Sequence, residues 1–395
     1  MRISLVIRDL FKKILKIRLH IVRGNTDIVI LDDYNAHYLE KVASKYSCLY
    51  LRRGYYDLYV SLLTPIYFIF YFVKLKKVYK SAYLASIRVI NPMLCLTYID
   101  NSEFVFLTSN YLQPIRTIAI QNGQRTCFNT AMPNLIGKTI DTFVSFGCLE
   151  VDEYKRVGID VINHVPFGSL KNVLYKTNKN NNLPSSISPY ILYVSQFRKE
   201  RLMSNHKTID NYHKIITNAI KVAKILKVEL QIMLVNKRGE GEYFDEIKWY
   251  KEYGFKMSAL IDNDKVKLKA YDIIENAQLL IGFTSTLLRE GFGRGKKTLF
   301  VNYTGDHEYD FPVQGLWKLV NPSDTKFINS AIELYQMPVD QYNDIACEAA
   351  EYVMLNPDSL DMLSNIIDGY IENVVPYKYL KQHCGNSSKF SSPGI

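Results

Sequence analysis

The segment from Ala277 to Asn302 restricts the fold most, because its pattern is that of a parallel strand–helix–strand unit. Its parts are the apolar run Leu279–Phe283, the hydroxyl-rich turn Thr284–Thr286, a short helical pattern stopping at Gly295, and the apolar run Thr298–Asn302. Parallel strands need a long crossover, which is usually a helix. The segment therefore predicts an α/β fold in which helices cover a mostly parallel sheet.

The turn of this unit also suggests a ligand. It brings backbone N–H groups, the hydroxyls of Ser285 and Thr286 and the positive end of a helix to one point, which suits a phosphate. Glu290 falls one helical turn after Thr286, on the same face, where a carboxylate can hold a ribose hydroxyl. Helix capping by Ser285 and Gly295 explains the same residues without a ligand. The segment alone leaves both interpretations open.

The rest of the chain repeats the alternation of strand and helix. A length of 395 residues favours two domains. Short apolar runs, typical of buried parallel strands, occur in both halves. They are Thr26–Asp32, Met93–Asp100, Arg116–Gln121, Thr142–Phe146, Tyr190–Ser195 and Val228–Val235, in addition to the two strands above. This pattern predicts two Rossmann-like domains.

A polar, Asn- and Ser-rich stretch divides the two halves and predicts a linker over residues 173–189. On this basis we expect a first domain over 26–172 and a second domain over 190–376. Residues 1–25 are expected to form a basic amphipathic helix, and the polar residues 377–395 a flexible tail.

The charge of the chain limits the classes of partner, and its cysteines indicate the cellular compartment. The 49 Lys and Arg residues exceed the 39 Asp and Glu residues, so the net charge of +10 favours phosphates, nucleic acid or acidic lipid. The six cysteines are scattered and have no histidine cluster beside them, which favours reduced thiols in the cytoplasm and argues against zinc. Asp262-Asn-Asp264 has the D-x-D form of a metal motif, but its place in a polar loop of the second half favours a chance match.

Three further stretches bear on membranes. The apolar run Tyr59–Val73 is shorter than the roughly 20 residues that span a bilayer, so we expect a buried or interfacial helix. Met1–His20 and Lys74–Lys80 are basic and amphipathic, and such helices can lie on anionic lipid. A solvated surface helix is the alternative for both.

Ligands of doubly wound sheets bind beyond the carboxyl ends of the strands, so we examined the residues that follow each run. In the first half these are acidic and amide-bearing: Asp32 and Asp33, Asp100 and Asn101, and Gln121–Arg125. In the second half they are basic and hydroxyl-bearing: Ser195–Arg198, Asn236–Arg238 and Thr284–Thr286. This division suits an acceptor with reactive hydroxyls on one side and a phosphorylated donor on the other.

An ordered series of short motifs resembles a known family. The motifs are Ile99–Asn101, Ile118–Gly123, Phe146-Gly147, Val165–Leu170, Tyr193–Gln196 and Thr284–Lys297. Together they resemble glycosyltransferases of the GT-B fold, particularly bacterial proteins of surface-carbohydrate biosynthesis (O-antigen, lipopolysaccharide and capsule). The likeness covers most of Thr26 to Asn302 in order and spacing.

The resemblance implies a role for each candidate residue. The second domain would hold a nucleotide-sugar donor, with Ser285 and Thr286 at the phosphate, Glu290 at the ribose, and Ser195, Gln196, Lys237 and Arg238 lining the donor side. Gln121, Asn122 and Arg125 would position the acceptor. A general base must reach the acceptor hydroxyl, and Asp100, or second Asp33, is expected to serve; capping of its strand is the other role open to Asp100. Glu150 and Asp152 rank below them. The fold implies neither metal nor cofactor.

The sequence thus predicts a cytoplasmic glycosyltransferase, peripheral to the inner face of the cell membrane, that extends a surface polysaccharide or a lipid-linked oligosaccharide. A nucleotide-sugar 2-epimerase is the alternative enzyme, and a nucleic-acid-binding protein is suggested only by charge. Families that use CMP-sugars or CDP-polyols often carry His-Pro where this chain has Asn236-Lys237. This difference argues against a sialyltransferase or glycerophosphotransferase activity and leaves the nucleotide open among UDP, GDP, CMP and dTDP.

Overall fold

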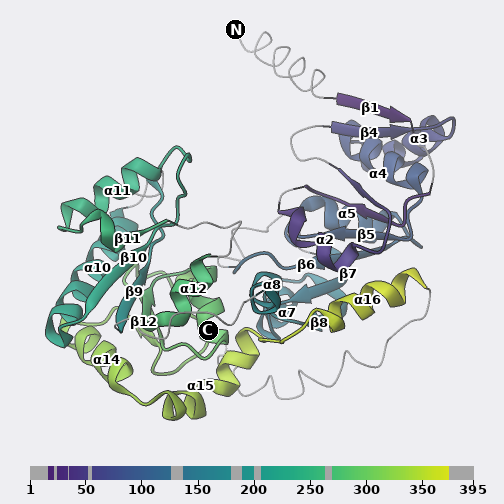
Figure 1. The fold of residues 1–395 in the computed structure, drawn as a ribbon. Helices are drawn as coiled ribbons and strands as arrows, with labels where there is room; N and C mark the ends of the chain where they lie inside the picture. Colours follow the sequence, from purple (N-terminus) through teal and green to yellow (C-terminus); the bar gives the residue numbers. More distant parts are fainter. Residues whose placement is uncertain are drawn as a thin grey trace, which may run out of the picture.

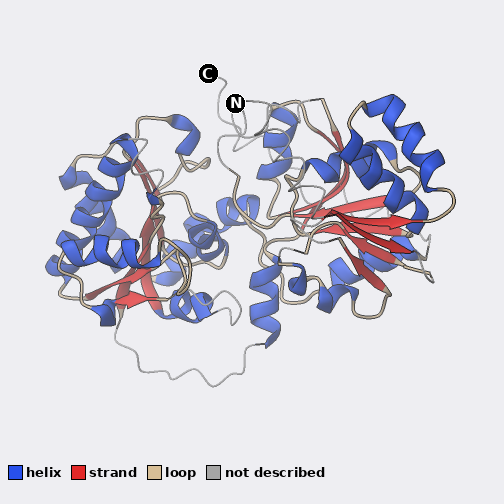
Figure 2. Cartoon of the chain, turned by 90° about the horizontal axis from the view of Figure 1, so that it is seen from above, coloured by secondary structure: helices blue, strands red, loops and turns tan. Residues whose placement is uncertain are grey.

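Two parallel sheets of six strands each form the core of the protein (Figure 1). This is a computed structural model, and it describes residues 17–21, 25–33, 35–51, 56–125, 137–178, 189–199, 206–262 and 269–372. The sheets lie in separate halves of the molecule, with helices packed around each of them (Figure 2). The prediction of two Rossmann-like α/β domains is confirmed.

The first sheet is buried on both faces. Its strand order is β3 (Cys48–Tyr50), β2 (Ile28–Ile30), β5 (Leu94–Thr97), β6 (Arg116–Ile120), β7 (Thr139–Ser145) and β8 (Asp160–Pro166). Along β2 the side chains of Ile28 and Ile30 enter one apolar cluster, whereas Val29 enters another. Alternation between two cores explains why the sequence of β2 is an unbroken apolar run. The helices of this half include α2 (Glu40–Ala43), α4 (Val78–Ile90), α5 (Glu103–Tyr111), α7 (Leu149–Arg156) and α8 (Leu170–Asn178).

The second sheet has the strand order of a dinucleotide-binding fold. The order is β11 (Leu260–Ile261), β10 (Glu229–Met233), β9 (Tyr190–Val194), β12 (Ala277–Gly282), β13 (Thr298–Asn302) and β14 (Lys318–Val320). Chain order therefore reverses between β9 and β12, where ligands of such sheets bind. Its helices include α10 (His206–Leu226), α11 (Tyr243–Glu252), α12 (Lys269–Asn276), α13 (Thr286–Gly293), α14 (Asp324–Gln336) and α15 (Val339–Val353).

The amino-terminal region differs from the expectation of a helix over 1–25. Ile17–Ile21 forms strand β1, which pairs in parallel with β4 (Tyr56–Val60) as a separate two-stranded sheet. Pairing with β4 satisfies the backbone of β1, and the ring of His20 stacks on Tyr59 at a centroid distance of 4.9 Å. This long-range partner outweighs the helical periodicity. Residues 1–16 lie outside the described residues.

The chain crosses between the two halves at two places. Residues 173–178, which we placed in the linker, continue helix α8 and bury Val173 and Leu174; most of the remaining expected linker, and the expected tail, lie outside the described residues. The second crossing follows α15, after which α16 (Asp361–Ile371) inserts Leu363 and Ile367 into the core beside β2. We therefore propose that the first domain is completed by this carboxyl-terminal helix.

Four of the six cysteines lie within the described residues. Cys48, Cys95 and Cys347 are free thiols, as expected. Cys148 is disulfide-bonded, so the expectation of reduced thiols is wrong for this residue. In the part of the chain that is described, every helix is too short or too polar to traverse a bilayer.

Glycines allow the second crossing to lie against the first domain. A Cβ at Gly147 would collide with the carbonyl oxygen of Tyr352, and one at Gly168 would collide with that of Leu355. Gly168 also has a φ of 99°, a conformation that other residues rarely adopt. The backbone N–H of Leu355 donates to the carbonyl of Phe146 at 2.8 Å, which fixes the contact.

Gly168→Ala is expected to lower the free energy of unfolding by about 2–4 kcal/mol, because the new methyl group meets backbone that cannot rotate away. Gly241→Ala is the matched control, since nothing lies within 4 Å of a Cβ there and its φ is not in the left-handed region. Urea denaturation of both variants measures the difference. Equal stability would show that the crossing segment yields without cost.

Candidate functional site

At the point where chain order reverses in the second sheet, side chains that follow the two flanking strands contact each other. Val194 of β9 and Gly282 of β12 are partners in the sheet. Just beyond them the hydroxyl of Thr284 donates to the side-chain oxygen of Gln196 at 2.8 Å. This places Gln196, one of the predicted donor residues, beside the hydroxyl-rich turn.

Helix α13 begins at this turn, as the sequence predicted. Ser285 has extended backbone geometry and its hydroxyl accepts a hydrogen bond from the N–H of Leu287 at 3.2 Å. The capping interpretation is therefore correct for Ser285. It does not exclude a ligand, because this bond uses a lone pair and leaves the hydroxyl proton able to donate.

A loop of the first domain meets the start of α13. The N–H of Gln124 donates to the hydroxyl oxygen of Thr286 at 2.9 Å, and a Cβ on Gly123 would lie 3.3 Å from the same oxygen. This loop follows β6 and contains the predicted acceptor residues. The predicted donor and acceptor sides are thus in direct contact at Thr286.

The acceptor loop is held by an ion pair in the interior. Asp100 is 0% exposed, and its carboxylate accepts two bonds from the guanidinium of Arg125, one of them at 3.0 Å. The hydroxyl of Tyr154 donates to it at 2.9 Å and the N–H of Asn122 at 3.4 Å. Arg125 also donates to the side chain of Asn122 at 2.9 Å. These donors surround Asp100, and the geometry favours a positioning role over that of a general base.

Gln121 has a similar structural role. It is fully buried, its side-chain oxygen accepts from the N–H of Phe146 at 2.7 Å, and its amide donates to the carbonyl of Gly123 at 3.1 Å. Gln121 therefore ties the acceptor loop to the end of β7. Asn122 is partly exposed in the same loop. Asp33 lies elsewhere: it is exposed just after β2, where chain order reverses in the first sheet.

Ser195 is buried under the donor side. Its hydroxyl donates to Glu246 at 2.5 Å and accepts from the hydroxyl of Tyr250 at 2.8 Å. Glu246 in turn accepts from the N–H groups of Val235 and Asn236 at 3.0 and 2.9 Å. Burial raises the pKa of Glu246, and these donors oppose that shift. Glu246 thus binds together the loops after β9 and β10. Sequence reasoning missed it, although its place beside the buried Tyr243, Ile247 and Tyr250 of α11 is a recognisable signal.

The basic residues of the donor side are accessible. Arg198 is exposed and donates to the side chain of Asn236 at 2.8 Å. Lys237 is exposed, and the side chain of Arg238 is 80% exposed and lies 4.0 Å from Asp262. Asp262 also accepts from the hydroxyl of Tyr243 at 2.7 Å. Asp264 lies outside the described residues, within which no cluster of three or more potential metal ligands occurs.

Glu290 faces the first domain instead of solvent. It is 3% exposed and accepts a hydrogen bond from the hydroxyl of Ser169 at 2.5 Å. Burial raises the pKa of Glu290, while Lys171 and the hydroxyls of Ser169 and Tyr271 oppose the shift. In this arrangement the carboxylate joins α13 to the beginning of α8.

A second buried carboxylate joins the same helix to the first domain. Glu150 of α7 pairs with Arg289 of α13 at 2.5 Å, and both side chains are at most 2% exposed. Burial raises the pKa of Glu150 and lowers that of Arg289, and each partner opposes the shift of the other. Asp152, the other minor candidate, accepts from the hydroxyl of Tyr352 at 2.7 Å. These carboxylates hold the halves together.

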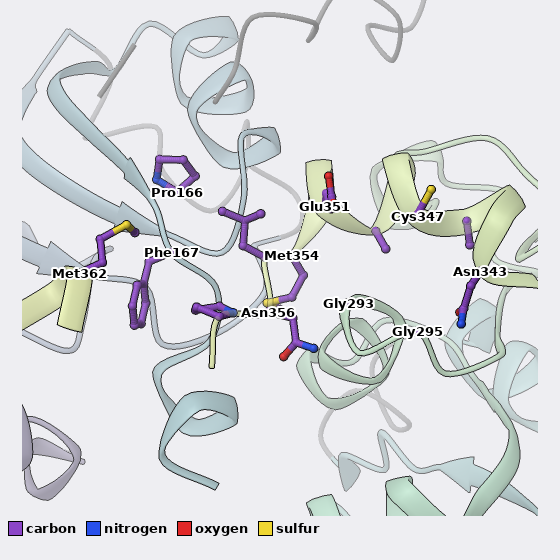
Figure 3. A pocket seen from close by; sticks show the side chains of 14 residues that line it. Pro166, Phe167, Gly293, Gly295, Asn343, Cys347, Glu351, Met354, Asn356 and Met362 are labelled. Carbon is purple, nitrogen blue, oxygen red and sulfur yellow. The ribbon is translucent and has the colours of Figure 1, made fainter. Parts of the chain in front are cut away.

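A pocket of about 530 Å³ opens at a different place, beside the second crossing (Figure 3). Its lining is mostly apolar and contains Phe167, Met354 and Met362, with Gly293 at the end of α13. None of the predicted site residues lines it. The predicted polar site residues instead gather at the opposite, amino-terminal end of α13.

Two facing Rossmann-like domains with a polar contact between their strand ends define the GT-B fold, as the resemblance predicted. Residues 118–324, just over half of the chain, match the model of a family described as "putative O-antigen biosynthesis protein". The chain belongs to this family. No curated protein matches the sequence significantly.

The chain is similar to several solved structures, and the two with TM-scores of at least 0.50 support the fold. S. aureus MnaA, solved with UDP, is 11% identical, with 89% of this chain and 98% of that chain covered and a TM-score of 0.51. The UDP-GlcNAc 2-epimerase of Methanocaldococcus jannaschii, with UDP-GlcNAc and UDP, is 11% identical, with coverages of 86% and 99% and a TM-score of 0.50. A variant of the wall teichoic acid polymerase TagF is 12% identical, with 93% of each chain covered and a TM-score of 0.47.

Proposed function

We propose that this protein is a glycosyltransferase that moves a sugar from a nucleotide-sugar donor to a surface polysaccharide or lipid-linked glycan. The observation that carries the proposal is the 2.9 Å bond from Gln124 of the first domain to Thr286 at the start of α13. A phosphate bound at this helix end would lie next to the strand ends of the first domain, where an acceptor hydroxyl can approach. Membership of an O-antigen biosynthesis family supports this reaction class.

The accessible residues are assigned to the donor. The hydroxyl protons of Ser285 and Thr286 can donate to phosphate oxygens, because the recorded bond of each hydroxyl, from Leu287 or Gln124, uses a lone pair. The exposed Lys237 and Arg238 add positive charge on the same side. The helix end and these cations would stabilise the departing nucleotide phosphate, a role that needs no metal.

Buried and exposed carboxylates are assigned different roles on the acceptor side. Asp100 and Gln121 hold the loop that presents Asn122. Glu290 and Ser195, in the second domain, stabilise the donor side. Asp33 is the proposed general base, since it is exposed at the reversal point of the first sheet and a base must reach the acceptor hydroxyl.

Ser285→Ala is expected to weaken donor binding about 10- to 100-fold, the effect of losing one hydrogen bond to a charged group. Ser323→Ala is the matched control, because Ser323 caps α14 with a hydrogen bond of the same 3.2 Å length and is not a predicted donor residue. Both variants should lose about 1 kcal/mol of stability from the lost cap. Calorimetric titration with the bound nucleotide sugar separates the two effects, and equal donor affinities would remove Ser285 from the donor site.

The donor itself is identified by thermal-shift measurements with UDP-, GDP-, CMP- and dTDP-sugars, since a ligand of the folded state raises the melting temperature. The stabilising sugar is then incubated with the protein, with and without glycan extracts as acceptors. Transfer that requires an acceptor supports the proposal. Conversion of the donor into an epimer without acceptor would overturn it in favour of a nucleotide-sugar 2-epimerase.

A further inference from the structure

Helix α3 (Thr64–Leu75) is apolar on two opposite faces. Its inner face packs Tyr67, Phe68, Tyr71 and Leu75 into the core of the first domain. Its outer face, together with the turn before it, carries a continuous apolar stripe. We call this stripe the α3 patch; its members are Leu62 (98% exposed), Leu63 (52%), Ile66 (63%), Ile69 (61%), Phe70 (49%) and Val73 (69%). A helix that is apolar all round is normally buried, so this outer face needs a cover.

The neighbourhood of the α3 patch is also apolar. The patch belongs to the end of the first domain formed by α3, α4 and the β1–β4 pair (Figure 1). On β1, Leu19 and Ile21 are 68% and 70% exposed, and Val78 at the start of α4 is 64% exposed. Such a concentration of exposed aliphatic side chains exceeds the scattered ones of an ordinary surface.

The chain segment that carries the α3 patch is basic. Residues 58–99 contain no Asp or Glu but five basic residues, Lys74, Lys76, Lys77, Lys80 and Arg88. Lys80 pairs with Glu103, and Arg88 donates to a carbonyl of the protein. The other three lysines are exposed at the carboxyl end of α3, and the ammonium of Lys74 lies 4.1 Å from the ring centre of Phe70. A cationic rim on an apolar face matches the interface of an anionic bilayer.

We propose that the α3 patch docks on the surface of an anionic lipid bilayer, with α3 lying in the plane of the membrane. Twelve residues of helix span about 18 Å, against roughly 30 Å for the hydrocarbon core, so α3 is too short to cross it. A second copy of this chain is a poorer occupant, because an isologous contact would bring the same lysine clusters together. The inference does not depend on the proposed transferase reaction.

Co-sedimentation of the full chain with phosphatidylcholine vesicles, with and without phosphatidylglycerol, tests the proposal. We expect binding to the anionic vesicles and an at least tenfold lower partition coefficient for Leu62→Ser/Ile66→Ser/Ile69→Ser. The matched control is Ile225→Ser/Phe244→Ser/Ile345→Ser, which removes three side chains of 57, 74 and 47% exposure from the second domain. Lys74→Ala/Lys76→Ala/Lys77→Ala should abolish the preference for phosphatidylglycerol. Thermal unfolding of every variant checks its fold.

Two outcomes would overturn the proposal. Equal vesicle binding by the wild type and the α3 variant would place the membrane contact elsewhere or remove it. A dimer that dissociates on Leu62→Ser/Ile66→Ser/Ile69→Ser, in the absence of vesicle binding, would make a second copy the occupant. Donor binding by the wild type, measured separately, decides the fate of the proposed reaction independently of either result.

Discussion

Arg289→Met is expected to lower the free energy of unfolding by about 3–5 kcal/mol, because it leaves the carboxylate of Glu150 buried without its partner. The pair joins α13 to α7, so the contact between the halves should loosen as well. Chemical denaturation gives the free energy, and limited proteolysis reports the loosened contact.

The helix that supplies Glu150 also offers a control. Arg156 pairs with Glu153 of the same helix at 2.7 Å, but their side chains are 53% and 27% exposed. Arg156→Ala should therefore cost less than about 1 kcal/mol. Glu150→Leu combined with Arg289→Met should recover part of the loss, since replacing both members of a buried pair removes the unpaired charge. A single Arg289→Met variant as stable as the wild type would contradict the buried pairing.

Asp100→Asn is the second large effect, with an expected loss of about 2–4 kcal/mol. The substitution keeps the shape but removes the negative charge that faces the guanidinium of Arg125, whose side chain is 13% exposed. The acceptor loop should become less ordered, which lowers turnover and leaves donor affinity almost unchanged. Stability is measured by denaturation and the kinetic constants with the identified donor.

Asp33→Asn serves as the comparison for Asp100, because it removes a carboxylate from an exposed position. If Asp33 is the general base, this variant should lose turnover while its stability changes by less than about 0.5 kcal/mol. The positioning role of Asp100 would be refuted if Asp100→Asn folded as stably as the wild type and lost activity alone.

Eight strands were predictable because each is a short apolar run between polar turns, whereas β3, β4, β8, β11 and β14 were not identified in the sequence. β12 and β13, for example, occupy 277–282 and 298–302, close to the runs identified in the sequence. Their regularity follows from burial on both faces, a property of parallel sheets that is visible in a single sequence. The start of α13 was predictable for a related reason, since helix caps involve neighbours within a few residues.

The features that the sequence did not reveal depend on partners that are far apart in the chain. Strand β1 forms only because β4 lies beside it, about forty residues along the chain. The roles of Asp100 and Glu290 stay predictions, but their hydrogen bonds with Arg125 and Ser169 were equally invisible in the sequence. No local pattern reveals such pairing, although a charged residue on an apolar helix face, as at Glu246 and Arg289, indicates a buried partner.

The two chain crossings between the domains have a mechanical consequence. One follows α8, and the other follows α15 and is tied to the first domain by the 2.9 Å bond from Lys176 to the carbonyl of Asn356. A single tether would let the halves swivel freely, whereas the second crossing, held at Lys176, restricts that motion. Opening for substrate entry would separate Gln124 from Thr286, and closing would restore the hydrogen bond between them.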